Sequence, residues 1–278
     1  MIQQELCVDN DIDNLFRSTV PRYPELRGQV AVVTGAAQGI GQGIAVRLAR
    51  EEMRVVLADK DPQNLASTVS SLRQLGATVV DFLGDLSQSG VIQQLFEQTV
   101  ATFQGLHLLI NNAADLQRKR LLDEHEALLD HQLATNIRGP YLCSYQAAKI
   151  MQASGGGNII HLSSVGSLRA HEIGLPYDVT KGAINAMTRA MAIDLSEYNI
   201  RVNAIAPGVT HTYRWPAVDH PNAQAVVGRI PLRRFGTVSD ISAMAAFLAS
   251  SEASYITGQI IYVDGGITTQ LSPPGNRL

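Results

Sequence analysis

The chain has 278 residues, of which 45% are hydrophobic, and a formal net charge of −3. This length suits one large α/β domain or two smaller ones, and the apolar fraction supplies a sizeable core. The near-neutral charge and the lack of a basic run argue against a nucleic-acid partner, and no stretch approaches the roughly 20 apolar residues that a membrane helix needs.

The N-terminus and the cysteines favour a cytoplasmic location. No basic region followed by an apolar run is present, so a secretory signal is not expected. Cys7 and Cys143 fit neither a disulfide framework nor a metal site, and inert thiols in a reducing compartment are the expectation. Metal-ligand spacing is also lacking among the histidines His107, His125, His131 and His161. We therefore expect no metal.

Residues 1–27 form a polar N-terminal extension that is acidic around Asp11 and Asp13. Such a segment can pack on the surface or fray, and we assign it no chemistry. Residues 28–278 show no repeat, low-complexity tract or linker, so a single domain is expected there.

From residue 30 onward, short β-branched or apolar runs alternate with longer stretches of helical period. The predicted strands are 30–34, 55–58, 78–83, 106–110, 158–162, 201–206 and 260–263. The predicted helices include 40–50, 91–103, 183–195 and 241–248. This alternation predicts a single-domain, Rossmann-type, doubly wound parallel sheet of about seven strands, flanked by helices. Ligands then bind at the carboxyl ends of the strands.

The first predicted strand runs directly into a turn that contains Gly35, Gly39 and Gly41. Its spacing differs from the usual G-x-G-x-x-G, but it meets the same needs. These are a tight turn, close backbone approach to a pyrophosphate and a helix N-terminus aimed at the anion. A glycine-rich turn can also be merely structural. Its position after the first strand of an alternating pattern favours a dinucleotide.

Asp59 ends the second predicted strand, where a carboxylate would accept hydrogen bonds from the adenosine ribose and repel a 2′-phosphate. Gln38 stands in the turn where a basic residue could have bound that phosphate, and Lys60 is the one contrary sign. Asp59 could instead be a simple polar strand end. We expect NAD rather than NADP as the cofactor.

Further motifs follow in chain order, and they carry a resemblance. They are Asp85-Leu86, Asn111-Asn112-Ala113-Ala114, Thr135-Asn136-Ile137, Ser163-Ser164, Tyr177-Asp178-Val179-Thr180-Lys181 and Pro207-Gly208. With the glycine turn, they make residues 26–266 resemble the short-chain dehydrogenase/reductase family. Its Asn-Asn-Ala-Gly motif ends here in Ala114, which adds a methyl near the floor of the cofactor site.

The resemblance implies both a catalytic set and a cofactor site. The implied catalytic residues are Asn136, Ser164, Tyr177 and Lys181. The implied cofactor contacts are Gly35, Gln38, Gly39, Ile40, Gly41, Asp59, Asp85, Leu86, Asn112, Tyr177, Lys181, Pro207, Thr210 and Thr212. The resemblance also implies that Asn136 holds a water linking Lys181 to solvent, and that Lys181 contacts the nicotinamide ribose.

The chemistry of these residue types agrees. A phenol has a pKa near 10, so Tyr177 is a poor base at neutral pH, and a pKa lower by about three units takes roughly 4 kcal/mol. An ammonium about 4 Å away supplies a similar amount at an effective dielectric near 20. Lys181 lies one helical turn after Tyr177 and can reach that distance. Ser164 would hydrogen-bond the reacting oxygen and stabilise developing charge.

Two segments are expected to line the substrate pocket. The first lies between Ser164 and Tyr177 and carries Arg169, His171 and Glu172. The second is a lid at about 209–235 that carries His211, Tyr213, Arg214, Trp215 and His220. Pro216 and Pro221 interrupt helix formation in this second segment, which suggests a mobile lid. Their hydrogen-bond donors favour a small polar substrate such as a sugar, polyol or hydroxy acid, with Ser164, His171 and Arg214 as contacts. Alternatively, these side chains face solvent.

The sequence thus predicts an NAD-linked oxidoreductase that interconverts a secondary alcohol and its ketone. Two alternatives stay open: an NADPH-dependent reductase of a 3-oxoacyl thioester, and a cofactor-binding regulator without turnover. The intact set of four catalytic residues argues against the regulator. The resemblance also implies a homotetramer in which the helices at about 122–154 and 177–196 pair across two-fold axes.

Overall fold

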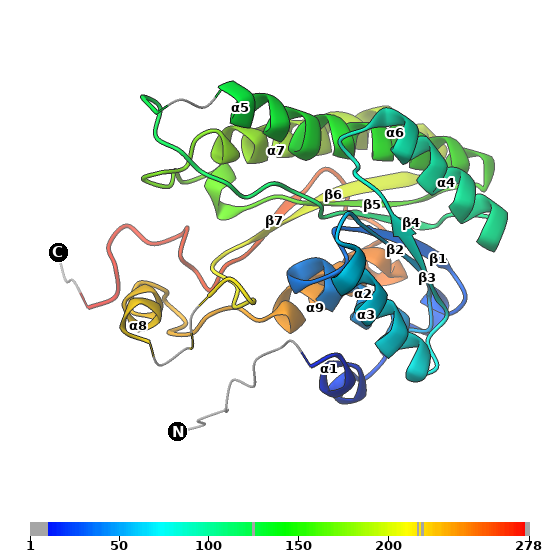
Figure 1. Cartoon of the computed structure of the whole chain (residues 1–278), viewed down its shortest axis with the longest axis horizontal. Helices are drawn as coiled ribbons and strands as arrows, with labels where there is room; N and C mark the ends of the chain where they lie inside the picture. The colour runs from blue at the N-terminus through cyan, green and yellow to red at the C-terminus, as the bar shows by residue number, and fades with distance from the viewer. Residues whose placement is uncertain (1–10, 124–125, 216, 218–219, 276–278) are drawn as a thin grey trace.

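A computed structural model describes residues 11–123, 126–215, 217 and 220–275 of the chain. Seven parallel strands form one sheet in the order β3-β2-β1-β4-β5-β6-β7 (Figure 1). Their bounds are β1 Val30–Thr34, β2 Arg54–Asp59, β3 Val79–Leu83, β4 Leu108–Asn111, β5 Gly157–Leu162, β6 Ile200–Pro207 and β7 Ile260–Val263. The predicted doubly wound sheet is confirmed, and each predicted strand ends within two residues of the observed one.

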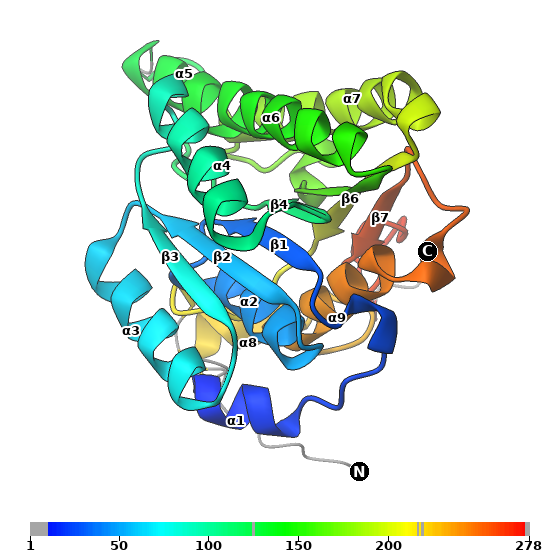
Figure 2. The same cartoon turned by 90° about the vertical axis from the view of Figure 1, so that its right-hand side faces the viewer.

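Helices cover both faces of the sheet (Figure 2). On one face lie α2 (Gly39–Arg50), α3 (Pro62–Gln74) and α9 (Val238–Ala249). On the other lie α4 (Ser89–Phe103), α6 (Gly139–Ala153) and α7 (Tyr177–Asp194), with α5 (Glu126–Gln132) leading into α6 through a π-helical segment, Leu133–Arg138. A short helix, α8 (Pro221–Val227), follows β6.

Strand β1 shows why the sheet must be covered twice. All its residues are buried, and successive side chains of a strand point to opposite faces. Ala31 and Val33 accordingly join the core on the α2 side, whereas Val30 and Val32 join the core on the α4 side. A continuous apolar strand is therefore stable here only because helices pack on both of its faces.

The described part of the N-terminal extension packs on the domain. Helix α1 (Ile12–Ser18) lies beside α2 and α3, and Leu15 joins the core (Figure 2). Glu51, at the end of α2, accepts hydrogen bonds from the backbone N–H groups of Arg22 and Tyr23 and pairs with Arg47 at 2.8 Å. Cys7 lies outside the described residues.

Membrane-spanning helices and metal-binding clusters are both absent from the described residues. No helix is both long and apolar enough to span a membrane. No group of three or more His, Cys, Asp or Glu side chains is arranged to hold a metal ion.

Glu51 should be a main stabilising contact of the N-terminal segment. Its side chain is 1% exposed and that of Arg47 is 11% exposed, so Glu51→Gln leaves a buried guanidinium without a counter-charge. We expect the free energy of unfolding to fall by about 3 kcal/mol, measured by urea denaturation at fixed protein concentration. The control is Glu52→Gln, because Glu52 forms an exposed ion pair with Arg27. Loss of this exposed pair should lower the free energy of unfolding by less than about 1 kcal/mol. Equal losses in the two variants would contradict this assignment.

Candidate active site

The sequence-predicted site residues gather at the carboxyl edge of the sheet. The glycine turn follows β1, Asn112 follows β4, Ser164 follows β5 and Pro207 ends β6. Strands β1 and β4 are neighbours, and the chain leaves them toward opposite faces. This is the switch point at which parallel sheets open a crevice for ligands.

The glycine turn is fixed by close packing. Gly35 has φ +63°, and a Cβ there would lie 2.8 Å from the Ala113 Cα atom. A Cβ on Gly41 would lie 2.1 Å from the Gly35 carbonyl oxygen. Both positions therefore exclude any larger residue.

Gly39 differs, because a Cβ there would meet nothing nearer than Tyr213 at 3.7 Å, although its φ of +63° favours glycine. Gly39 is the first residue of α2, and the side chain of the preceding Gln38 does not cap the helix. The first N–H groups of the helix can therefore donate hydrogen bonds to another acceptor. An open backbone at an uncapped helix N-terminus fits the pyrophosphate of a dinucleotide.

Asn112 holds the turn in place. Its side-chain amide donates to the carbonyl oxygens of Thr34 and Gly35, both at 2.9 Å, and the Thr34 hydroxyl accepts from the N–H groups of Asn112 and Ala113. Asn112 thus positions the cofactor turn through β1. Ala114, which replaces the glycine of the resembled motif, is half-buried in the same loop.

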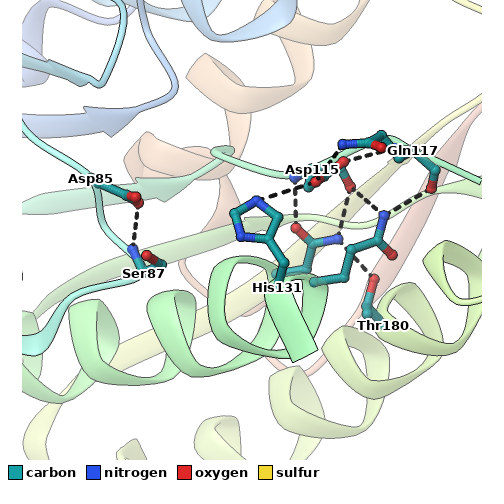
Figure 3. Close-up of polar contacts among 8 residues, drawn as sticks. Asp85, Ser87, Asp115, Gln117, His131 and Thr180 are labelled. Carbon is teal, nitrogen blue, oxygen red and sulfur yellow. Dashed lines mark hydrogen bonds and ion pairs between the residues drawn. The ribbon is translucent and has the colours of Figure 1, made fainter. Parts of the chain in front are cut away.

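Asp59, the last residue of β2, and Asp85, after β3, are the acidic residues expected to contact the cofactor, and both carboxylates accept backbone hydrogen bonds. Asp59 accepts hydrogen bonds from the Ala37 N–H at 2.9 Å and the Asp61 N–H at 3.0 Å, which fixes its carboxylate beside the glycine turn. Asp85 accepts from the Ser87 N–H at 3.0 Å, and this bond is the main reason that its pKa lies below the ordinary value (Figure 3). Leu86 is buried and Lys60 is exposed.

A cavity of about 680 Å³ lies between α1, α3 and the glycine turn. Its lining includes Ala37, Gln38, Asn64, Thr68 and Tyr213. Because the Ala37 N–H bonds Asp59, this space adjoins the expected ribose position rather than the catalytic residues.

Three of the four catalytic candidates meet at the junction of β5 and α7. Ser164 caps a short 3-10 turn and accepts from the Gly166 N–H at 3.0 Å. Tyr177 is the first residue of α7 and is 6% exposed. The Lys181 ammonium donates to the Leu162 carbonyl at 2.7 Å and lies 5.6 Å from the centre of the Tyr177 ring.

Asn136 reaches the same site from the π-helical segment and is buried. Its amide nitrogen donates to the Asp115 carbonyl at 2.9 Å and the Thr180 hydroxyl at 3.1 Å, while its amide oxygen accepts from the Asp115 N–H (Figure 3). The Thr180 hydroxyl in turn donates to the Tyr177 carbonyl. A π-helical turn here is consistent with a functional position.

The pKa of Tyr177 differs from the sequence-based expectation. Burial raises the pKa of Tyr177 above its ordinary value, whereas the Ser164 hydroxyl and the guanidinium groups of Arg118 and Arg214 lower it. The spacing predicted that the Lys181 ammonium would lower the pKa of the phenol; in the structure this ammonium lies 5.6 Å from the centre of the Tyr177 ring. Burial lowers the pKa of Lys181 itself to about 8, and its ammonium is directed to the Leu162 carbonyl.

Asp178 and Thr180, inside the Tyr-x-x-x-Lys motif, were expected to face away from the chemistry. The structure places Thr180 against Asn136 and uses Asp178 to fix the loop before α7. The Asp178 carboxylate accepts from the His171 N–H at 2.8 Å and bonds His171 Nδ1 at 2.8 Å. A Cβ on Gly166 or Gly174 would lie 2.2 or 2.1 Å from Asp178, so the loop wraps this carboxylate closely.

Several expected pocket residues have packing roles instead. Arg169 donates to the Thr268 carbonyl at 3.2 Å. His211 and Trp215 pack on the ring of Phe235 at 5.7 and 5.2 Å between ring centres. His220 caps α8 through its Nδ1. Pro216, expected in the lid, lies outside the described residues.

The sequence reasoning passed over Arg118. Its guanidinium carbon lies 5.0 Å from the centre of the Tyr177 ring. The signal was present as three consecutive basic residues, Arg118, Lys119 and Arg120, in the loop after β4, but nothing in the sequence assigns this loop to Tyr177.

The chain is similar in sequence and fold to several known oxidoreductases. Residues 35–268 match a family described as enoyl-(acyl carrier protein) reductase. Glucose 1-dehydrogenase 2 of Bacillus subtilis is 32% identical over 88% of this chain and 97% of its own. A 3-oxoacyl-[acyl-carrier-protein] reductase of Thermotoga maritima is 31% identical over 87% and 98%. The solved structure of a 7α-hydroxysteroid dehydrogenase, complexed with NADH and 7-oxo glycochenodeoxycholic acid, has a TM-score of 0.83 with 31% identity over 89% of this chain and 97% of that one.

The Asp178–His171 contact can be tested by hydrogen exchange. Asp178→Asn keeps the side-chain size but removes the charge that strengthens both bonds to His171. Hydrogen bonds to charged groups contribute about 1.5–3 kcal/mol to stability. The protection of the His171 amide against hydrogen exchange should therefore fall by roughly 10- to 100-fold in this variant. Asp194→Asn, an exposed position on the same helix, should leave that amide unchanged. Unaltered His171 exchange in Asp178→Asn would show that other contacts fix this loop.

Proposed function

The chain belongs to the short-chain dehydrogenase/reductase family of oxidoreductases. On that premise we propose that it is an NAD-dependent enzyme that interconverts a secondary alcohol and its ketone. The observation that carries the proposal is the meeting of Ser164, Tyr177 and Lys181 at the sheet edge that also holds the uncapped glycine turn. A pure binding protein has no evident need for this set.

The roles of the residues follow from their positions. Nicotinamide would accept or supply the hydride, and the glycine turn, Asp59 and Lys181 would hold the cofactor. During alcohol oxidation, Tyr177 takes the hydroxyl proton as general base, and during ketone reduction it returns that proton. The Ser164 hydroxyl donates to the same substrate oxygen and stabilises its developing charge.

Lys181 suits proton exchange with Tyr177. Its pKa of about 8 allows both protonation states near neutral pH. Asn136 has its amide engaged by Asp115 and Thr180, so we assign it the positioning of this helix and loop as well as the water that the family resemblance implies.

NAD preference is part of the proposal. Asp59 presents a fixed carboxylate at the expected ribose position, and Gln38 offers no positive charge there. A 2′-phosphate at that place would meet an anion at close range, whereas the two ribose hydroxyls can donate to it.

The cofactor preference can be measured directly. Wild-type protein should bind NAD at least tenfold more tightly than NADP in a fluorescence titration, and Asp59→Ser should narrow this difference by removing the carboxylate. Asp61→Ser is the control, since Asp61 caps α3 through the N–H groups of Gln63 and Asn64. Equal wild-type affinities would show that Lys60 or another base dominates.

Turnover should depend on the Tyr177 hydroxyl. Tyr177→Phe should lose about 10²- to 10⁴-fold in turnover, because general acid–base groups typically contribute that much, while NAD binding stays nearly intact. Tyr255→Phe, at a fully exposed position, is the control and should keep both properties. Steady-state kinetics and titration separate the effects. Near-normal turnover in Tyr177→Phe would remove this residue from the mechanism.

The two alternatives predict different behaviour. A 3-oxoacyl thioester reductase would turn over an acyl thioester with NADPH faster than any small alcohol with NAD; its support is the similarity to the 3-oxoacyl reductase of Thermotoga maritima. A regulator would bind NAD without turning over any of a broad panel of alcohols. Our proposal favours a small polar substrate, because His171 and Arg214 offer polar groups beside the catalytic residues.

We also propose a cytoplasmic homotetramer. Cys143 is unbridged and buried, and burial raises its pKa to about 12, as suits an inert thiol in a reducing compartment. Helices α6 and α7 expose Tyr141, Tyr145, Val179 and Ile193 by 54%, 54%, 52% and 77%. Exposed apolar side chains on adjacent helices suit a two-fold interface.

Sedimentation velocity should therefore show a tetramer at micromolar concentration. Ile193→Glu places a charge on the α7 surface and should shift the protein toward smaller species. Leu83→Glu, at a 56% exposed position on the edge strand β3, should not. A wild-type monomer would overturn this proposal.

A further inference from the structure

Two arginines from separate loops lie at the reacting end of the site. Arg118, in the loop after β4, places its guanidinium carbon 5.0 Å from the centre of the Tyr177 ring. Arg214 lies in the segment between β6 and α8, directly after Tyr213, whose ring would be 3.7 Å from a Cβ on Gly39 of the glycine turn. Its charge also lowers the pKa of Tyr177. Both side chains are exposed at the surface of the site.

Neither guanidinium is neutralised by the described part of the protein. No hydrogen bond or ion pair joins Arg118 or Arg214 to another described side chain, in contrast to the ion-paired arginines Arg17, Arg27, Arg47, Arg73 and Arg234. The nearby carboxylates have other partners. Asp178 is bonded to His171, and Asp115 is bonded to His131 and to the N–H of Gln117.

We propose that Arg118 and Arg214 together bind an anionic group of the substrate, a carboxylate or a phosphate. The proposal rests on the proposed function, because it places this group on the alcohol or ketone that Tyr177 acts on. Guanidinium is the side chain best suited to such oxyanions, since its planar donors match two oxygens at once. Arg118 follows β4 and Arg214 follows β6, and these two strands flank β5 in the sheet, so the anion would be bound from two sides.

The distance to Tyr177 limits where the anion can sit on the substrate. A guanidinium 5.0 Å from the ring centre lies within a few bond lengths of the phenolic oxygen, and thus of the substrate oxygen that it serves. The anionic group must therefore be a few bonds from the reacting carbon, as in a short hydroxy acid, a sugar acid or a phosphorylated hydroxy compound. The charges of a long acyl carrier would lie much farther away.

The test uses matched substrate pairs that differ mainly in charge. Short hydroxy acids are compared with their methyl amides, and phosphorylated hydroxy compounds with the parent polyols, by kcat/KM with NAD. Wild-type protein should prefer the anion of each active pair by roughly tenfold or more. Arg118→Gln and Arg214→Gln should each reduce this preference by about tenfold to a hundredfold. The ratio of kcat/KM for the anionic and the neutral member within one variant separates this effect from any change that the lost charge causes in proton transfer by Tyr177.

The control is Arg120→Gln, which removes the same charge from the same loop, two residues from Arg118. Arg120 does not contact the Tyr177 ring, so its loss should leave the preference unchanged. A second readout needs no turnover: a short acid without the hydroxyl should bind to the protein with NADH, and Arg118→Gln should weaken this binding by a similar factor. Whether the acids or the phosphates are the better substrates identifies the anionic group.

The outcomes separate this inference from the proposed function. Neutral alcohols that turn over better than their anionic partners, or a charge preference unaltered in both arginine variants, would overturn the anion site and leave the oxidoreductase standing. A reduction of preference in Arg120→Gln equal to that in Arg118→Gln would also overturn it, since general surface charge would then explain the effect. No turnover of any alcohol, with cofactor binding intact, would overturn the proposed function instead.

Discussion

The packing of α7 against the end of β5 is the constraint on which the site depends. Helix α7 buries Tyr177, Thr180 and Lys181 on one face, and the Lys181 ammonium meets the carbonyl of Leu162, the last residue of β5. A buried ammonium is costly unless it is bonded, so this contact fixes the helix relative to the strand. Ser164 follows that strand by two residues, and the same contact therefore sets its distance from Tyr177.

Burial gives the site its chemical character. It raises the pKa of Tyr177 and lowers that of Lys181 to about 8, so both groups move toward their neutral forms. The opposing influence on Tyr177 comes from loops, through Arg118 and Arg214. Helix α7 thus supplies Tyr177 and Lys181, while the loops after β4 and β6 lower the pKa of Tyr177. In the proposed anion site, substrate charge and proton transfer would be coupled at one place, because the same guanidinium groups would act on both.

The loop before α7, which carries the proposed substrate contact His171, is tied directly to this helix. Asp178 is anchored on α7 next to Tyr177, and it bonds both the backbone and the ring of His171. Gly166 and Gly174 let the chain pass close to the carboxylate. Helix α7 therefore carries both Tyr177, the proposed proton-transfer group, and the carboxylate that supports the neighbouring loop, which limits how far either can move relative to the other.

The sequence by itself determined the alternation of strands and helices along the chain, the glycine turn and the spacing of Tyr177 and Lys181. These features depend on local periodicity and on neighbours one helical turn apart. The hydrophobic period alone placed the start of α7 at residue 183, because Gly182 and the polar residues before it weaken the helical pattern. The family resemblance implied a start at about 177, and packing on the sheet does extend the helix back to Tyr177. Only the tertiary structure decided that Arg118 lies on the Tyr177 ring and that Asp178 bonds His171. Those contacts join segments whose approach is set by the packing of whole elements, and no local pattern records it.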